Sequence, residues 1–236
     1  MMITMQSMLP RVISTERDPS GLGRWISQLV EGQGDHKARY VSAYVPSKNQ
    51  RKATVYSQHR SYFQKLASDE STEAADREPI QAWMEDFAKE VKVWCEAGEK
   101  IIIHMDANSD VRTGPVAITL RPLGFEEQVT FRHGPLHPPP ATHMANTRGI
   151  PIDGVWTNFS HGQLRCGYTG MEEGLPGDHR TVWIDVPTEL LFGHRPPHLH
   201  RVYPPGLVVN DPRVRVKYNR EVKAKLKAKG MLKQAA

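Results

Sequence analysis

The chain has 236 residues, of which 39% are hydrophobic, and a formal net charge of +5 at pH 7, and this length predicts one domain with or without a tail. No apolar run approaches the roughly 18–20 residues of a membrane helix, and the start lacks the features of a secretory signal, which excludes membrane and secreted classes. Two cysteines, Cys95 and Cys166, are too few for a disulfide framework. They predict buried thiols in a reducing, intracellular compartment, with nucleus and cytoplasm not distinguished.

The first hundred residues predict an irregular start, one strand and two helices. Residues 1–23 are a mixed segment without a clear period. Residues 38–46 alternate and end in a proline, which is typical of a strand, and Tyr44 lies near its end. The patterns of residues 53–67 and 78–97 predict helices. In the second, apolar residues recur at helical spacing, which indicates a stripe that faces the core.

A buried strand is predicted over Ile101–Ile103, and it leads directly into Asp106 and Asn108. If the extended backbone continues through Ala107, both polar side chains lie on the same side of the sheet. A carboxylate can hold a cation or a proton, and an amide can donate to a phosphate oxygen. The strand end is therefore a candidate site, although a turn rich in Asp and Asn is also common for purely structural reasons.

Two later segments place an acid and a histidine beside strands. Asp153 lies in the apolar run Ile150–Trp156, and the pair Asp178 and His179 precedes the alternating run Thr181–Val186. A carboxylate in an apolar strand should be buried, and a buried carboxylate needs a partner. A histidine is the natural partner, because the carboxylate would orient the ring and make it more basic.

Four motifs, taken in chain order, resemble those of the endonuclease/exonuclease/phosphatase superfamily. They are Ala43–Pro46, Met105–Asn108, Ile152–Gly154 and Gly177–His179. The resemblance covers roughly residues 18–187 and implies an α/β fold, a partial four-layer α/β/β/α sandwich. Three further stretches look like the variety encoded beside reverse transcriptases in non-LTR retroelements: Asp18–Trp25, Tyr56–Gln58, and Asp211–Val214 with Tyr218 and Asn219.

The resemblance implies a phosphodiesterase domain over residues 24–192 that uses Mg²⁺ or Mn²⁺. The catalytic residues would be Asp106, Asn108, Asp153, His179 and Tyr44. Asp178 and Asp106 would hold the metal ion. Contacts with substrate would come from Arg148, Thr142 and Arg60. His179 would act beside the phosphate as base or proton donor, and Asp153 would fix its tautomer.

The sequence also departs from the superfamily pattern. Its members normally open with a strand carrying an Asn and another carrying a metal-binding Glu, and neither strand is recognisable here. Replacement of that Glu by Glu16 or Asp18 is conceivable. Met105 stands where the superfamily has Gly and could crowd the approach to the site. We therefore expect an N-terminally truncated domain with weak metal binding, and self-association through uncovered strands.

The C-terminal part differs in composition from the rest. Residues 193–212 are a linker rich in Pro and His, in which a metal site would lack a Cys or an acid to complete it. Residues 213–236 contain nine Lys or Arg against one acid, which leaves 22 against 25 in residues 1–212, so the positive charge belongs to this tail. The tail is predicted to be helical or disordered, and it either binds nucleic-acid phosphates or is simply solvated.

Three functions are consistent with these patterns. The first is a metal-dependent phosphodiesterase, an endonuclease-like hydrolase of DNA. The second is a truncated, inactive remnant whose basic tail binds nucleic acid or nothing. The third is a phosphatase of the same superfamily, which only a profile of substrates would distinguish.

Overall fold

The computed structural model describes residues 2, 8–49, 51–69, 77–134, 139–146, 149–159, 162–174, 176–194 and 212–229. The chain divides into two compact units, Met1–Arg195 and Pro196–Ala236, and each is described by itself.

The first unit is built on a six-stranded sheet with the strand order β1-β2-β3-β4-β6-β5. Its strands are β1 (Val12–Arg17), β2 (Trp25–Glu31), β3 (Lys37–Tyr44), β4 (Lys100–Asp106), β5 (Glu126–Glu127) and β6 (Asp153–Thr157). β3 and β4 pair in parallel, and every other pair in this sheet is antiparallel. The strands predicted around Tyr44, Ile102 and Asp153 are confirmed, whereas the segment expected to be irregular supplies the edge strand β1.

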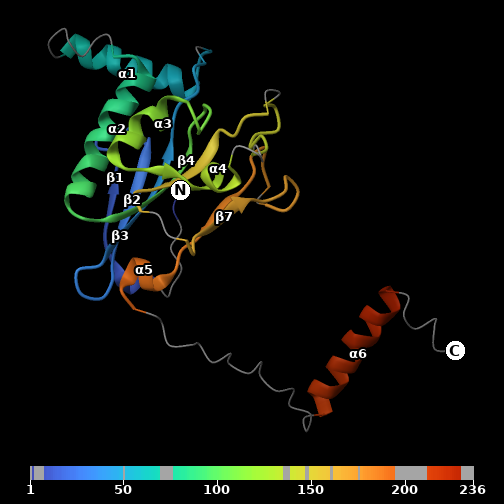
Figure 1. Ribbon diagram of the computed structural model, residues 1–236. Coiled ribbons are helices and arrows are strands. Elements are labelled where there is room, and N and C mark those ends of the chain that lie inside the picture. The colour runs from blue at the N-terminus through green and yellow to red at the C-terminus, as the bar shows by residue number, and fades with distance from the viewer. Residues whose placement is uncertain are drawn as a thin grey trace. The chain divides into compact units, whose positions relative to one another are not determined.

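Helices cover one face of this sheet (Figure 1). They are α2 (Pro79–Glu96) and α3 (Pro115–Leu120), and α1 (Val55–Asp69) packs against α2. α2 begins where the carboxylate of Glu78 accepts the Gln81 N–H, with proline in the first turn, and Gly98 beyond its end has a left-handed φ of +71°. Both helices predicted from periodicity are confirmed.

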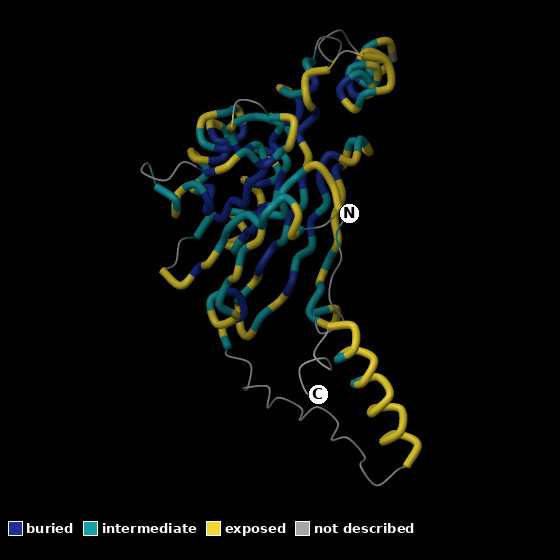
Figure 2. Tube along the Cα trace, turned by 90° about the vertical axis from the view of Figure 1, so that its right-hand side faces the viewer, coloured by how far each residue is buried: buried dark blue, intermediate teal, exposed yellow. Residues whose placement is uncertain are grey.

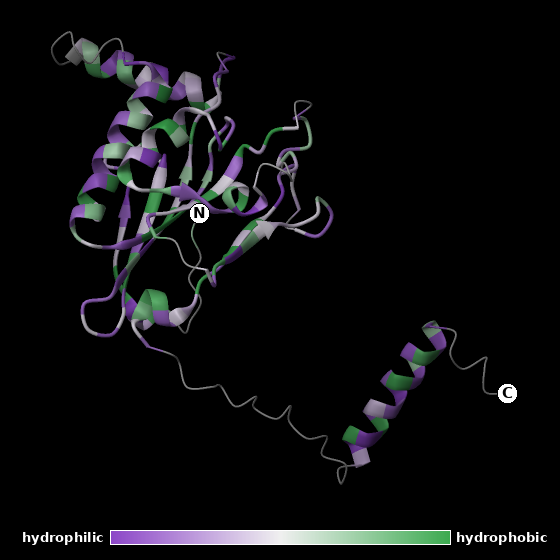
Figure 3. Cartoon of the chain, in the orientation of Figure 1, coloured by the Kyte–Doolittle hydropathy of each residue, from purple (hydrophilic) through white to green (hydrophobic). Residues whose placement is uncertain are grey.

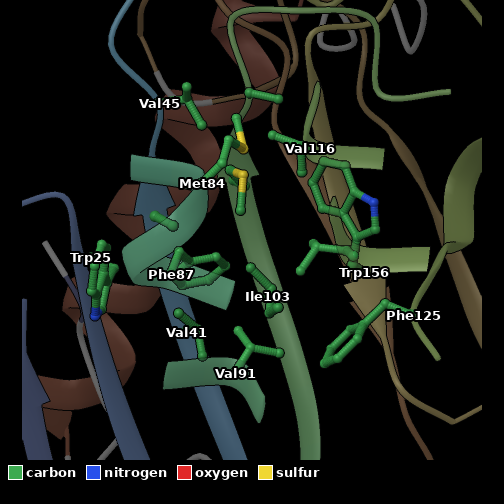
Figure 4. Close-up of a cluster of buried hydrophobic side chains, with 14 of the residues drawn as sticks. Trp25, Val41, Val45, Met84, Phe87, Val91, Ile103, Val116, Phe125 and Trp156 are labelled. Carbon is green, nitrogen blue, oxygen red and sulfur yellow. The ribbon is translucent and has the colours of Figure 1, made fainter. Parts of the chain in front are cut away.

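The main core lies between α2 and the sheet. Trp83 and Phe87 of α2 are fully buried in this core. Figure 4 shows Phe87 among Trp25, Ile103 and neighbouring apolar side chains. Side chains alternate along a strand, so Ile101, Ile103 and Met105 of β4 face α2. The intervening residues, which include Asp106, therefore face the other side of the sheet.

A smaller second layer lies over that other side. It contains the two-stranded sheet of β7 (Arg165–Tyr168) and β8 (Val182–Asp185), and the short helices α4 (Gln128–His133) and α5 (Thr188–Phe192). The layer leaves a hollow of about 790 Å³ between β2–β4 on one side and β8 and α5 on the other. Figure 2 shows buried and half-buried segments alternating along these strands. The predicted α/β fold class is thus confirmed.

The second unit is described only as α6 (Pro212–Ala228), a helix without a buried residue. Figure 3 shows hydrophilic residues interspersed with apolar ones along it. The basic tail is therefore helical over its described residues, while most of the predicted linker, including His198 and His200, lies outside the described residues. None of the described helices is long and apolar enough to cross a bilayer. Cys95 and Cys166 are both free thiols.

Candidate active site

Asp106 is the last residue of β4, and the chain turns immediately after it. Asn108 has a left-handed φ of +45°, a conformation that Asn tolerates better than most residues. Its N–H donates to Asp106 Oδ1 over 3.0 Å, and its Nδ2 donates to the Val45 carbonyl over 2.7 Å. Asn108 itself is therefore not extended, so period-2 alternation does not place its side chain. The amide is bound to the main chain, and its contact with phosphate stays a prediction.

Three side chains from separate segments lie close together at this end of β4. The antiparallel register of β4 and β6 sets Asp106 beside Asp153. His179, from the segment before β8, lies with its Nδ1 2.8 Å from Asp153 Oδ2, so the predicted pairing of a buried acid with a histidine is confirmed. One ligand atom from each of Asp106, Asp153 and His179 lies within 4.8 Å of the others.

The electrostatics of this cluster follow from burial and from two acids side by side. Burial, and then the charge of Asp153, raises the pKa of Asp106 to about 6. The Asn108 N–H and the nearby His179 and His143 partly oppose this. For His179, burial disfavours the protonated ring, but the hydrogen bond and charge of Asp153 outweigh it, so that the pKa is raised. The cluster can therefore exchange protons near neutral pH.

Asp106 and Asp153 border a hollow of about 250 Å³, whose wall also includes Ser42, His104 and Arg180. Burial lowers the pKa of His104, which favours its neutral form. Arg180 donates from Nε to the Ala141 carbonyl and from a terminal nitrogen to Thr169. Arg180 was not among the residues predicted from the sequence, although it directly follows His179.

Thr142 connects the two segments that carry Asp153 and His179. The residue is fully buried, and its hydroxyl accepts the N–H groups of Ile152 at 2.9 Å and Asp153 at 3.0 Å. Its carbonyl accepts the N–H of Arg180 at 2.7 Å. These bonds join the start of β6 to the segment of His179. They give Thr142 a structural role, and its predicted contact with substrate stays a prediction that its burial does not favour.

A second pair of side chains, His143 and the predicted residue Asp178, lies beside His179, and of these two only His143 was not predicted from the sequence. His143 and His179 form an isolated antiparallel bridge, and their rings meet edge to face at 4.6 Å. Nε2 of His143 lies 3.2 Å from Asp178 Oδ2. Ligand atoms of His143, Asp178 and His179 form the other His/Asp group among the described residues. No local pattern marks His143, because its role depends on the pairing of two distant segments.

The remaining predicted residues are not members of the two His/Asp clusters among the described residues. Tyr44 is the register partner of Asp106, and 37% of its surface is exposed. Arg60 is on α1, outside the two clusters, and Arg148 lies outside the described residues. Met105 is buried in the core with α2 and also lines the hollow beside Asp106, and crowding of the site by this residue stays a prediction.

The two acids considered as replacements for the missing Glu have other partners. Glu16 pairs with Arg39 at 2.7 Å, and Asp18 pairs with Arg24 at 2.7 Å. Neither belongs to the two His/Asp groups found among the described residues. Their carboxylates stabilise β1 and the turn after it, and the structure gives no support for either as a metal ligand.

Neither a known protein family nor a curated protein sequence matches this chain. Among solved structures, the human Nocturnin catalytic domain with bound sulfate is 14% identical, with a TM-score of 0.42 over 71% of this chain and 56% of that one. A mutant of Staphylococcus aureus beta toxin with bound magnesium ions is 13% identical, with a TM-score of 0.37 over 68% and 53%.

Sphingomyelinase C from Streptomyces griseocarneus is 9% identical to this chain, with a TM-score of 0.32 over 68% of this chain and 53% of that one. The chain thus spans little more than half the length of these proteins. At such identities the likeness concerns the fold alone.

Proposed function

We propose that the chain is a metal-dependent phosphodiester hydrolase, an endonuclease-like enzyme of the retroelement type that acts on DNA. The observation that best supports this is the convergence of Asp106, Asp153 and His179, whose ligand atoms lie within 4.8 Å of one another although the residues come from three distant segments. Two carboxylates and an oriented imidazole can together bind a cation, activate a water and move a proton, which are the steps of metal-assisted hydrolysis.

The donor set fits a hard divalent ion. Two carboxylates lie on neighbouring strands, and the pKa of Asp106 is raised by its burial and by the charge of Asp153, so a cation between them would relieve the repulsion. Mg²⁺ and Mn²⁺ prefer oxygen ligands and are usually held by one or two carboxylates. Asp106 and Asp153 would hold the ion, with Asp178 as a further predicted ligand. Such an ion neutralises phosphate oxygens and stabilises the leaving oxygen.

The protein's own groups supply the proton transfers. Asp153 engages Nδ1 of His179, which leaves Nε2 to give a proton to the leaving oxygen or take one from water. Without a bound cation the pKa of Asp106 is about 6, and with the ion bound its carboxylate would hold and position the attacking water. Tyr44 and Asn108 are proposed to donate to the phosphate, and Thr142, Arg148 and Arg60 to contact the rest of the substrate.

The test is nicking of supercoiled plasmid DNA by the purified chain, with and without Mg²⁺. We expect Mg²⁺-dependent nicking that falls by about 100-fold or more in His179→Ala, because a general acid or base contributes about 10²–10⁴-fold. His133→Ala, a histidine outside the cluster, should nick like the wild type. Equal traces of nicking in wild type and His179→Ala would remove the proposal. Hydrolysis of phosphate monoesters alone would favour the phosphatase instead.

A second candidate function rests on α6. The helix carries seven Lys or Arg and a single acid, Glu221, and none of its residues is buried. A basic helix can bind along the phosphates of a nucleic acid even when it carries a thin apolar stripe, as this one does with Val222 and Leu226. This property supports the alternative in which the chain binds nucleic acid without cleaving it, and it is equally compatible with an active nuclease.

A further inference from the structure

His143 lies at the point where two distant segments meet. The Met144 N–H donates to the Asp178 carbonyl at 2.9 Å, and the Arg180 N–H donates to the Thr142 carbonyl at 2.7 Å. These main-chain bonds bracket His143 and His179 and set the two rings opposite each other. Because the bracket is made by the main chain, a substitution of the His143 side chain leaves it in place.

The hydrogen bonds of His143 decide where its proton lies. The Ala145 N–H donates to Nδ1 at 3.1 Å, so Nδ1 must be the acceptor atom of the ring. The neutral ring then carries its proton on Nε2, which lies 3.2 Å from Asp178 Oδ2 and donates to it. A nitrogen that carries a proton cannot ligate a metal. His143 is therefore a donor to Asp178 in this arrangement rather than a third ligand.

The Asp178 carboxylate needs a hydrogen-bond partner to be held in one rotamer. Its side chain is 71% exposed, whereas His143 is 25% exposed and is fixed by the main chain. A free surface carboxylate samples several rotamers, and holding it in one removes that entropic cost from ion binding. We propose that His143 is a positioning residue that holds the Asp178 carboxylate beside His179, ready to bind a divalent ion. This inference rests on the proposed function, in which Asp178 is a metal ligand.

The two histidines then have parallel roles. His179 is oriented by Asp153, and Asp178 is oriented by His143, with the two rings in edge-to-face contact. Residues that orient a metal ligand in this way contribute about 10–100-fold to metal affinity. This sets the scale of the effect that the test must detect.

The test measures Mn²⁺ binding to the full chain by electron paramagnetic resonance of the free ion, which needs no substrate. We expect His143→Ala to weaken Mn²⁺ binding about 10-fold or more. His143→Gln, whose amide can still donate from a similar place, should bind within about 3-fold of the wild type. Asp178→Asn should weaken binding at least as much as His143→Ala, and the double variant no further, since the two residues act as one unit.

Wild-type Mn²⁺ affinity in His143→Ala, or additive losses in the double variant, would overturn the inference. Failure of the wild type to bind Mn²⁺ would overturn it as well, since no ion would remain for Asp178 to hold. If binding follows the expected pattern but none of the proteins nicks DNA, the proposed function fails and the positioning role of His143 stands.

Discussion

Replacing Asp106 by Asn should stabilise the protein at neutral and alkaline pH. Asp106 is paired in register with Asp153, and its pKa is raised from an ordinary 3.8 to about 6, first by burial and then by that neighbouring charge. A change of this size in pKa corresponds to roughly 3 kcal/mol at most of unfavourable free energy in the folded, ionised state. Asn keeps the shape and can still accept the Asn108 N–H, while its amide can donate to Asp153.

The sign of the effect depends on pH in a definite way. The folded state binds the proton of Asp106 more tightly than the unfolded chain, so this group lowers the stability of the wild type as pH rises from about 4 to about 6. Below about pH 4 the carboxyl is protonated in both states and the substitution should be almost neutral. Above about pH 6 the full difference should appear, with Asp106→Asn more stable than the wild type.

The assay is urea unfolding of both proteins between pH 4 and pH 8, with the exposed Asp35→Asn as a matched control. The advantage of Asp106→Asn should grow with pH toward roughly 3 kcal/mol, while the control should stay within about 0.5 kcal/mol of the wild type. Added Mg²⁺ should stabilise the wild type more than Asp106→Asn. A variant that is no more stable than the wild type at pH 8 would refute the reasoning about paired charges.

Three other properties can be tested directly. Thr142→Val should destabilise the protein by about 2–4 kcal/mol in urea unfolding, because a buried and a partly buried N–H group lose their acceptor; the exposed Thr113→Val should cost under about 0.5 kcal/mol, and equal costs would contradict this role. DNA affinity should fall with salt, with a log–log slope no steeper than about −8 for the nine cations of residues 213–236, and should vanish on deletion of these residues; binding that survives the deletion would exclude the tail. The Ile13 side chain is 50% exposed on the edge strand β1. Light scattering should therefore show self-association of the wild type that weakens in Ile13→Lys. A monodisperse wild-type monomer would count against self-association through this strand.

The parts of the structure that the sequence predicted depend on short-range periodicity. The helical spacing of Trp83 and Phe87 located α2, and an acid in the apolar run around Asp153 indicated a buried carboxylate with a histidine partner. The period-2 alternation of β4 also predicts which face of the sheet each of its side chains occupies. Asp106 faces the second layer, so the Met105 side chain is expected to face α2, where the structure places it in the core.

The parts that were missed depend on contacts between distant segments. The role of His143 arises from the pairing of its segment with that of His179, which no local pattern encodes. Glu16 pairs with Arg39 across the sheet rather than serving the site. At Asn108, the residue type was read as a phosphate donor, but its tolerance of left-handed backbone and its bond to Val45 decided its place.

The central claim is that Asp106, Asp153 and His179 form one site, and the pKa of His179 tests it most directly. Its ring should titrate above 6.5 in the wild type when followed by NMR, because the nearby carboxylates favour the charged form. The pKa should fall clearly in Asp153→Asn, which loses the 2.8 Å partner, and to a smaller extent in Asp106→Asn. A His179 pKa that is the same in the wild type and both variants would contradict the account.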